Sequence, residues 1–142
     1  MSVVIRQAGR LMHAEPEHRG ILALDIQGFG RLDRSNPARV RMRTGLHRIL
    51  QNALTAAGIH PESADQSEYG DGILVLLDPQ ISKARLLYPL LPRLVSGLAQ
   101  YNGAAPDGER LRLRVVVHAG ELLRDGYGMT GEDLVLVPIA RL

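Results

Sequence analysis

Two aspartates, Asp25 and Asp71, each lie beside an apolar segment and next to glycines, and together they could bind a divalent cation. Asp25 falls near the end of the apolar run 20–26, and Asp71 precedes Gly72 and the run 73–77. Two carboxylates aimed at one point repel each other, and hard oxygen ligands of this kind suit Mg²⁺ or Mn²⁺ held together with substrate phosphates. Two such ions can activate an attacking hydroxyl and neutralise a leaving pyrophosphate.

The glycines around these aspartates suit phosphate chemistry as well. A residue without a side chain lets backbone N–H groups approach phosphate oxygens. The glycines concerned are Gly28, Gly30, Gly70 and Gly72. Each aspartate also has a purely structural explanation, because Asp25 could cap the turn into Gly28, and Asp-Gly is favoured in any tight hairpin turn. A site is therefore indicated only by the pairing of the two aspartates, which requires neighbouring strands.

The first elements needed to position Asp25 are a strand and a helix. The run 20–26 is short, nearly continuously apolar and followed by a glycine-rich turn, which is typical of a buried central strand. Ser35 ahead of Pro37 is a helix start signal, and an apolar stripe at helical spacing predicts a helix over 37–57 that Gly58 ends. The expected stripe consists of Val40, Leu46, Ile49, Leu50 and Leu54.

The next elements are a hairpin and a second helix. Residues 63–69 and 73–77 flank a Gly-Asp-Gly sequence, which predicts a hairpin with the second aspartate at its apex. The second helix is expected over 83–101, and Pro89 and Pro92 should either kink it or delay its start, because proline cannot continue a helix without losing a hydrogen bond.

The last elements are strands. Residues 111–117 first alternate and then become fully apolar, which predicts a strand that runs into His118. Residues 121–124 are expected as its hairpin partner across a turn at 125–126. Residues 133–137 fit one more strand or the first turn of a helix. A histidine that closes an apolar strand is usually a structural residue, so we assign His118 no catalytic role.

In order, these elements give a βαββαβ layout, which is a ferredoxin-like α+β sandwich with a mostly antiparallel sheet and helices on one face. In this layout the first strand and the hairpin lie side by side at the sheet centre, so Asp25 and Asp71 can converge. We expect residues 1–19 to form an N-terminal arm or a short helix and residues 20–142 to form one domain.

Composition narrows the function classes. A chain of 142 residues with 45% hydrophobic residues is the size of one globular domain. The 17 Lys and Arg residues nearly balance the 15 Asp and Glu residues, and only five aromatic rings of Phe and Tyr are present, which argues against nucleic-acid binding. The absence of cysteine removes disulfides and thiolate metal sites. No apolar run approaches the length of a membrane span or the pattern of a secretory signal, so a cytoplasmic location is expected.

Three motifs in this order resemble a known family. The segments are Leu24-Asp25-Ile26-Gln27-Gly28-Phe29, Tyr69-Gly70-Asp71-Gly72 and Val117-His118-Ala119-Gly120-Glu121. The first is similar to the D-I-x-G-F signature of class III adenylate/guanylate cyclase catalytic domains, the second to the family's second metal motif, and the third to its following strand-end motif. The resemblance spans about residues 20–134.

The resemblance implies a function and a site. A nucleoside triphosphate would bind through two Mg²⁺ or Mn²⁺ ions, and its 3′-hydroxyl would attack the α-phosphate to give a 3′,5′-cyclic nucleotide and pyrophosphate. The implied metal ligands are Asp25, Ile26 and Asp71. The implied backbone contacts to the triphosphate come from Gln27, Gly28, Phe29 and Gly70. The family's sites form between two subunits, so a head-to-tail homodimer is implied.

The sequence also departs from the family pattern. The family places an Asn four residues after a glycine, here Gly131, and an Arg four residues further on, but these positions hold Val135 and Ile139. A two-residue insertion would give the catalytic arginine role to Arg141 and leave the Asn position apolar. Losing one such transition-state contact typically costs about 10² to 10³ in rate.

The residues at the positions that select the nucleotide base in the family, and the length of the domain, both differ from the family pattern. The two base-selecting positions hold Ser67 and Gly128, which fit neither the adenine nor the guanine pattern. The family fold continues beyond the position of Leu142, so we expect a truncated or divergent version. Three hypotheses follow: an active nucleotidyl cyclase, a cyclase-fold module that binds nucleotide or a partner without turnover, and a dimerisation scaffold in which both aspartates are structural.

Overall fold

The computed structural model describes residues 3–7, 10–14, 16–30, 34–69, 71–125, 128–130 and 140–141. In this part of the chain one antiparallel sheet has the strand order β4-β5-β3-β6-β7, with β8 also paired to β6. Its strands are β3 (Glu17–Ile26), β4 (Ala64–Tyr69), β5 (Gly72–Leu77), β6 (Leu113–Asp125), β7 (Gly128–Thr130) and β8 (Ala140–Arg141).

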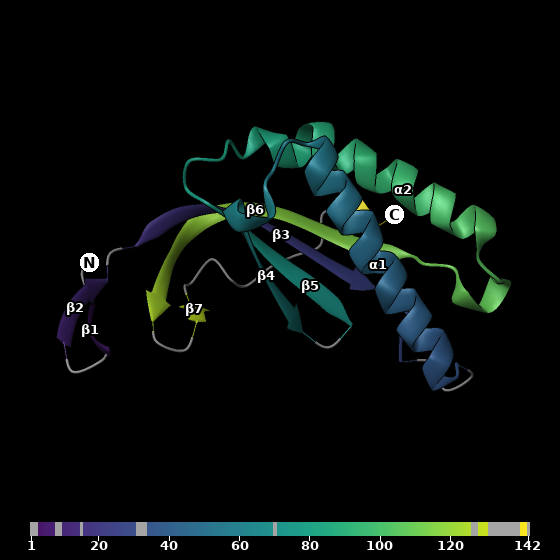
Figure 1. Cartoon of the computed structure of the whole chain (residues 1–142), viewed down its shortest axis with the longest axis horizontal. Helices are drawn as coiled ribbons and strands as arrows, with labels where there is room; N and C mark the ends of the chain where they lie inside the picture. Colours follow the sequence, from purple (N-terminus) through teal and green to yellow (C-terminus); the bar gives the residue numbers. More distant parts are fainter. Residues whose placement is uncertain are drawn as a thin grey trace.

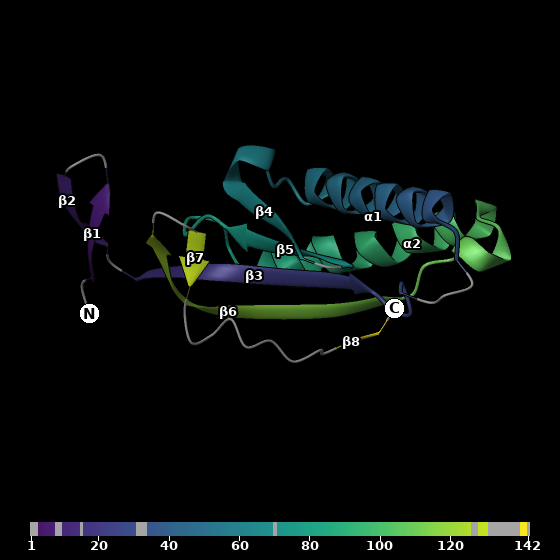
Figure 2. The ribbon, with the colours of Figure 1, turned by 90° about the horizontal axis from the view of Figure 1, so that it is seen from below.

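Two helices, α1 (Asn36–Ala56) and α2 (Leu91–Ala104), cover one face of this sheet (Figures 1 and 2). Short turns η1 (Pro61–Ser63), η2 (Leu86–Leu90) and η3 (Asp107–Glu109) connect the elements. The order β3-α1-β4-β5-α2-β6 is the predicted βαββαβ layout, so the predicted α+β fold class is confirmed. The prediction that the first strand pairs with the hairpin is also confirmed, because β3 lies between β5 and β6.

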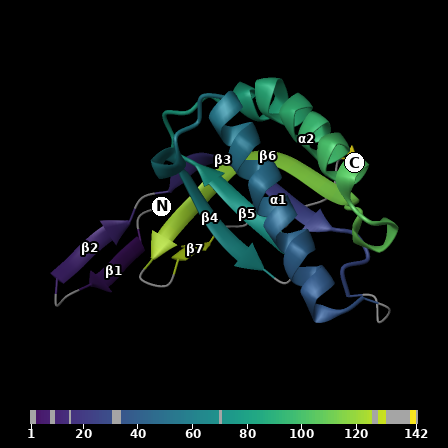
Figure 3. The same ribbon diagram turned by 45° about the vertical axis from the view of Figure 1, so that its right-hand side comes forward.

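The N-terminal arm forms a separate two-stranded hairpin of β1 (Val3–Gln7) and β2 (Arg10–Ala14). The alternative of a short helix in this arm was therefore wrong. Figure 3 shows this hairpin at the end of the sheet away from α1 and α2. Strand β3 begins at Glu17, three residues before the expected start, since Glu17 to Gly20 pair with β6.

The middle of β3 is apolar, and residues 21–24 are buried on both faces of the strand. Leu22, Leu24 and Ile26 belong to the large core beneath the helices. Ile21 lies in a smaller apolar cluster with Leu76, and alternating residues of a strand point to opposite faces. Asp25 therefore lies on the sheet face away from the helices.

Helix α1 begins and ends where the sequence predicted. The Ser35 side chain accepts a hydrogen bond from the amide of Ala38 at 3.2 Å, which satisfies one of the unpaired amides of the first turn. Gly58, with a φ of +69°, ends the helix in a conformation that favours glycine. One prediction was wrong: Val40 is 63% exposed, so the buried stripe runs through Met42 instead.

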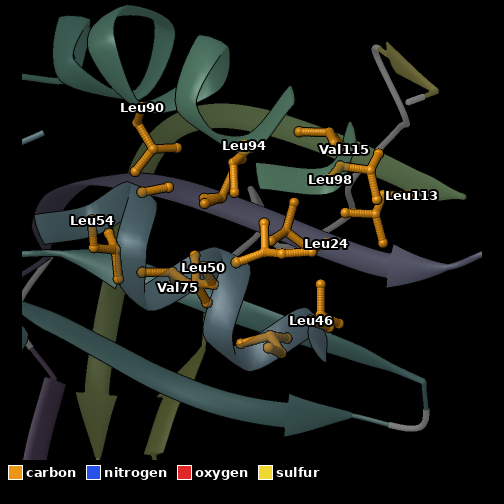
Figure 4. Close-up of a cluster of buried hydrophobic side chains, with 14 of the residues drawn as sticks. Leu24, Leu46, Leu50, Leu54, Val75, Leu90, Leu94, Leu98, Leu113 and Val115 are labelled. Atoms are coloured by element: carbon orange, nitrogen blue, oxygen red, sulfur yellow. The ribbon is translucent and has the colours of Figure 1, made fainter. Parts of the chain in front are cut away.

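Helix α2 starts late, as Pro89 and Pro92 predicted in one of two alternatives. The chain breaks helical geometry at Tyr88, with φ −152° and ψ 127°, and regular helix begins at Leu91. Leu90, Leu94 and Leu98 follow at helical spacing and point into the core, where they meet side chains of α1 and the sheet (Figure 4).

Strand β6 is longer than predicted. It runs without interruption from Leu113 to Asp125, so residues 121–124 continue the strand and are not its hairpin partner. They pair with β3 at Glu121 and Leu122, and the hairpin forms with β7 instead. The long partner strand β3 makes this possible, because its ten residues offer ladder positions along the whole length. Residues 133–137 lie outside the described part of the chain.

One buried cation, Arg19, joins three strands at the end of the sheet opposite to Asp25. Its side chain is 2% exposed and donates to the backbone oxygen of Leu77 and, at 3.2 Å, to that of Leu76. It also pairs with Glu17 at 2.9 Å and with Asp65 at 3.1 Å. Burying a charge is costly unless it is paired and hydrogen-bonded, and both conditions are met here.

Candidate functional site

The two aspartates singled out from the sequence lie at the same edge of the sheet. Asp25 is opposite Gly72 in the β3–β5 ladder, and Asp71 immediately precedes that glycine. The amide of Ile26 donates to the backbone oxygen of Asp71 at 3.1 Å, which ties the end of β3 to the hairpin. The antiparallel pairing of β3 and β5 brings these residues together although 46 positions separate them in the sequence.

The carboxylate of Asp25 is held by a residue that the sequence analysis did not single out. Arg114 of β6 is opposite Asp25 in the ladder and donates from Nε and Nη2 to the two carboxylate oxygens, each at 2.8 Å. The side chains are 20% exposed for the aspartate and 38% for the arginine. Two-point pairing of this kind fixes the carboxylate plane as well as its position.

The turn after β3 follows directly on Asp25. The amide of Gln27 donates to the backbone oxygen of Arg112 at 2.8 Å, and Gly28 has a φ of +66°. Arg34 donates to the backbone oxygens of Gly28 and Gly108, the latter at 3.2 Å, so the turn is fixed to η3. Phe29 packs against the core. Gly70, also expected at the triphosphate, lies outside the described residues.

The hairpin that carries Asp71 is anchored to α1 by an ion-pair cluster. Glu68 of β4 is 2.7 Å from the Arg43 guanidinium and 2.5 Å from His47 Nε2. The hydrogen bond from His47 and the charge of Arg43 lower the pKa of Glu68 below its ordinary value. Arg43, His47, Glu68 and Asp71 line one small hollow between the helix and the hairpin. This cluster positions the turn against the first helix.

The remaining predicted positions are distributed around this edge. Strand β8 places the Cα of Arg141 opposite that of Arg114, so Gly72, Asp25, Arg114 and Arg141 form one row across four strands. Ser67 is exposed on β4, and His118 is exposed on β6. Gly131, Val135 and Ile139 lie outside the described part of the chain, and Gly128 begins β7.

The residues at this end of the sheet supply donors of the type that a divalent cation and substrate oxygens would need, with the Asp25 side chain on the sheet face away from the helices and Asp71 in the hollow beside α1. Asp25 and Asp71 offer carboxylates, Ile26 offers a backbone oxygen, and Gln27 adds an oxygen, Oε1, that is buried and without a hydrogen-bond partner. All are hard oxygen ligands. Within the residues that the structure describes, no group of three or more histidines and carboxylates converges. Such a pair would leave coordination positions for phosphate oxygens.

A second hollow lies in the helix layer. A groove of about 570 Å³ separates α1 from α2, and its walls include Ile49, Arg48 and Gly97. The two helices approach each other closely where Tyr101 packs on Gly45. This groove is formed by helices that cover the sheet face opposite to the face of Asp25, so it is separate from the aspartate pair.

The fold is similar to those of solved cyclases. An adenylate/guanylate cyclase/hydrolase from Silicibacter pomeroyi gives a TM-score of 0.61 at 24% identity, covering 84% of this chain and 66% of that one. A bacterial light-regulated adenylyl cyclase gives 0.63 at 14% identity, covering 89% and 36%. The guanylate cyclase domain of RhGC from Catenaria anguillulae, in complex with GTP, gives 0.54 at 14% identity, covering 75% and 58%. The chain thus spans no more than 66% of the length of these structures.

Other comparisons are negative. No protein-family model matches the chain, and a search of curated proteins finds no match. None of the described helices is long and apolar enough to cross a membrane. At identities of 24% and below, the likeness to the solved structures concerns the fold. The chain has the fold of the class III adenylate/guanylate cyclase catalytic domains, as its three motifs predicted.

Proposed function

We propose that this domain binds a nucleoside triphosphate together with Mg²⁺ or Mn²⁺ and converts it to a 3′,5′-cyclic nucleotide and pyrophosphate. The observation that carries the proposal is the position of Asp25 beside the Asp71–Gly72 turn, with Ile26 hydrogen-bonded to Asp71 at 3.1 Å. This arrangement occurs in a fold similar to that of a guanylate cyclase domain solved with GTP.

Each part of the edge has a role in this proposal. Asp25 and Asp71 bind the cations through their carboxylates, and Ile26 adds its backbone oxygen. The bound ions would favour loss of the 3′-hydroxyl proton and neutralise the leaving pyrophosphate. Backbone amides of Gly28, Phe29 and Gly70 bind the triphosphate, whereas the amide of Gln27 already donates to the backbone oxygen of Arg112. Arg141 stabilises the charge that develops on the α-phosphate, since a positioned cation of this kind is worth several kcal/mol in a transition state, roughly 2.7–4.

A homodimer is part of the proposal. The resemblance implies sites shared between two subunits, and another similar solved structure is described as a dimeric guanylyl cyclase domain from Blastocladiella emersonii. Light scattering at several protein concentrations, with and without Mn²⁺ and triphosphate, tests this part separately from the chemistry.

A second candidate is a cyclase-fold module that binds nucleotide without turnover. Two sequence observations favour it: Val135 and Ile139 replace the polar residues that the family places after its glycine. Such a module would be stabilised by nucleotide and would release no product, because ligand that binds only the folded state raises its melting temperature.

The test is a thermal melt with Mn²⁺ and each of ATP, GTP, CTP and UTP, with the same samples assayed for cyclic nucleotide. The active domain gives a shift and product, and both depend on Mn²⁺. Asp25→Asn and Asp71→Asn each abolish the metal-dependent shift relative to the variant's own baseline. Asp107→Asn, at a side chain that is 94% exposed, is the matched control and leaves it unchanged. A shift without product selects the second candidate.

Two results would contradict both candidates. Metal and triphosphate could leave the melting temperature of the wild-type chain unchanged, or both aspartate variants could bind triphosphate as the wild type does. Either result would favour the scaffold hypothesis, in which Asp25 only pairs with Arg114 and Asp71 only shapes the hairpin turn.

A further inference from the structure

The most unexpected feature of the candidate site is that the carboxylate of Asp25 is already paired with the guanidinium of Arg114. Arg114 contacts both carboxylate oxygens at 2.8 Å, and the two residues face each other directly across the β3–β6 ladder. The aspartate side chain is 20% exposed and the arginine side chain 38%. A carboxylate has about four lone-pair positions, and Arg114 uses two of them.

We propose that Arg114 is an internal counter-ion of the metal site, which holds Asp25 when no metal is bound and lowers the affinity of the site for a divalent cation. The inference rests on the proposed function, because it assumes that Asp25 is a metal ligand. Arg114 is in this role a positioning residue, since it acts on the metal through Asp25.

Electrostatics fixes the direction of the effect. A cation bound to the Asp25 oxygens would lie within about 5 Å of the guanidinium, where a unit charge and a divalent ion still repel appreciably in water. The incoming ion must either share the carboxylate with Arg114 or displace it. Removing the guanidinium charge therefore tightens metal binding, by about tenfold after screening at physiological salt.

Loss of Arg114 is not expected to misplace Asp25. The backbone of the aspartate is paired on both sides, to Gly72 of β5 and to β6, and its neighbours Leu24 and Ile26 are fully buried. On Asp25 itself, the two side-chain torsions gain freedom while the backbone stays paired. In the variant without the guanidinium, the stronger attraction between the metal ion and Asp25 therefore outweighs the less fixed orientation of the Asp25 carboxylate.

The experiment measures Mn²⁺ binding to the whole chain without nucleotide, by calorimetry and by the melting temperature. Arg114→Met keeps the aliphatic stem and removes the charge. We expect its Mn²⁺ dissociation constant to fall about tenfold. Its melting temperature without metal should fall, because the half-buried carboxylate of Asp25 then lacks its counter-ion, and Mn²⁺ should raise that temperature by more than in the wild type.

Three further variants separate this role from a merely structural one. Arg114→Lys keeps the charge and should restore an affinity close to that of the wild type. Arg112→Met removes a charge from the exposed side chain just before β6, two residues from Arg114, and should change the affinity by less than about twofold, because screened surface charges interact weakly. The double variant Arg114→Met and Asp25→Asn should not show the tighter Mn²⁺ binding of Arg114→Met alone.

The proposal is overturned if Arg114→Met binds Mn²⁺ as weakly as the wild type or more weakly while it remains folded by circular dichroism. It is also overturned if neither protein binds Mn²⁺. Failure of the proposed function gives a different result. Arg114→Met would then bind Mn²⁺ more tightly than the wild type, but triphosphate would not shift the melting temperature. That result would support the counter-ion role of Arg114 and contradict nucleotide binding.

Discussion

Replacing Arg19 by methionine tests whether the buried guanidinium stabilises the sheet through the backbone or through its ion pairs. Arg19 is 2% exposed and donates to the backbone oxygens of Leu76 and Leu77, which are themselves buried. Its ion-pair partners Glu17, Asp65 and Asp78 are 43%, 46% and 37% exposed. After the substitution water can solvate the three carboxylates, whereas the two backbone oxygens lose their side-chain donor inside the protein.

The magnitude follows from this difference. Each buried oxygen left without its donor costs about 1–2 kcal/mol, and loss of the charge-assisted contacts to half-exposed carboxylates adds about 1 kcal/mol. Methionine keeps most of the apolar stem, so packing changes little. We expect Arg19→Met to lower the free energy of unfolding by about 3 kcal/mol, which corresponds to a fall of about 10 °C in melting temperature for a domain of this size.

The assay is urea unfolding followed by circular dichroism, with Arg110→Met as the matched control. Arg110 pairs with Asp107 at the surface, where both side chains are more than half exposed, so its loss should cost less than about 0.5 kcal/mol. Arg19 lies at the opposite end of β3 from Asp25, so Mn²⁺ binding by the folded variant should remain unchanged. A loss below about 1 kcal/mol would refute the assignment of the stabilisation to the buried backbone contacts.

Two further predictions concern the helix layer. Gly45→Ala places a Cβ 2.4 Å from Cε2 of Tyr101 and should lower the free energy of unfolding by about 1–3 kcal/mol in the same urea assay. Gly103→Ala, at a helical position with open space around it, should instead be neutral or stabilise by up to about 1 kcal/mol, and equal effects of the two variants would contradict the packing argument. The third prediction concerns pH: the hydrogen bond from His47 and a neighbouring arginine lower the pKa of Glu68 in the folded state, so its stabilisation is fully present above the ordinary pKa of 4.5 and is lost as the pH falls through the lowered value. The difference in melting temperature between the wild type and Glu68→Gln should therefore shrink as the pH falls below 4.5 and through the lowered pKa of Glu68, and a difference that stays constant throughout an acid titration would contradict it.

The sequence by itself predicted the elements and their order because the signals are local. Capping by Ser35, the end of α1 at Gly58 and the apolar run of β3 depend on neighbouring residues only. The late start of α2 likewise follows from two prolines. The motifs around Asp25 and Asp71 add the resemblance to the cyclase catalytic domains, and the solved structures confirm the fold.

These local sequence patterns could not predict contacts between residues that are far apart in the sequence. Val40 fits the apolar period of α1 and is nevertheless exposed, because which side of a helix is covered depends on where α2 packs. Residues 121–124 extend β6, because β3 is long enough to pair with them. Arg19 is charged and buried, which only the convergence of β4 and β5 on its guanidinium allows.

In the candidate site too, the sequence predicted some residues and the tertiary structure determined others. Residue types and glycine turns identified Asp25 and Asp71, and the alternation of residues 111–117 left Arg114 as one of several exposed positions. Only the strand register decided that Arg114 faces Asp25 and that Arg141 follows in the same row. A shift of one residue would turn every side chain of a strand to the other face, so register is set by the whole hydrophobic core and not by any short segment.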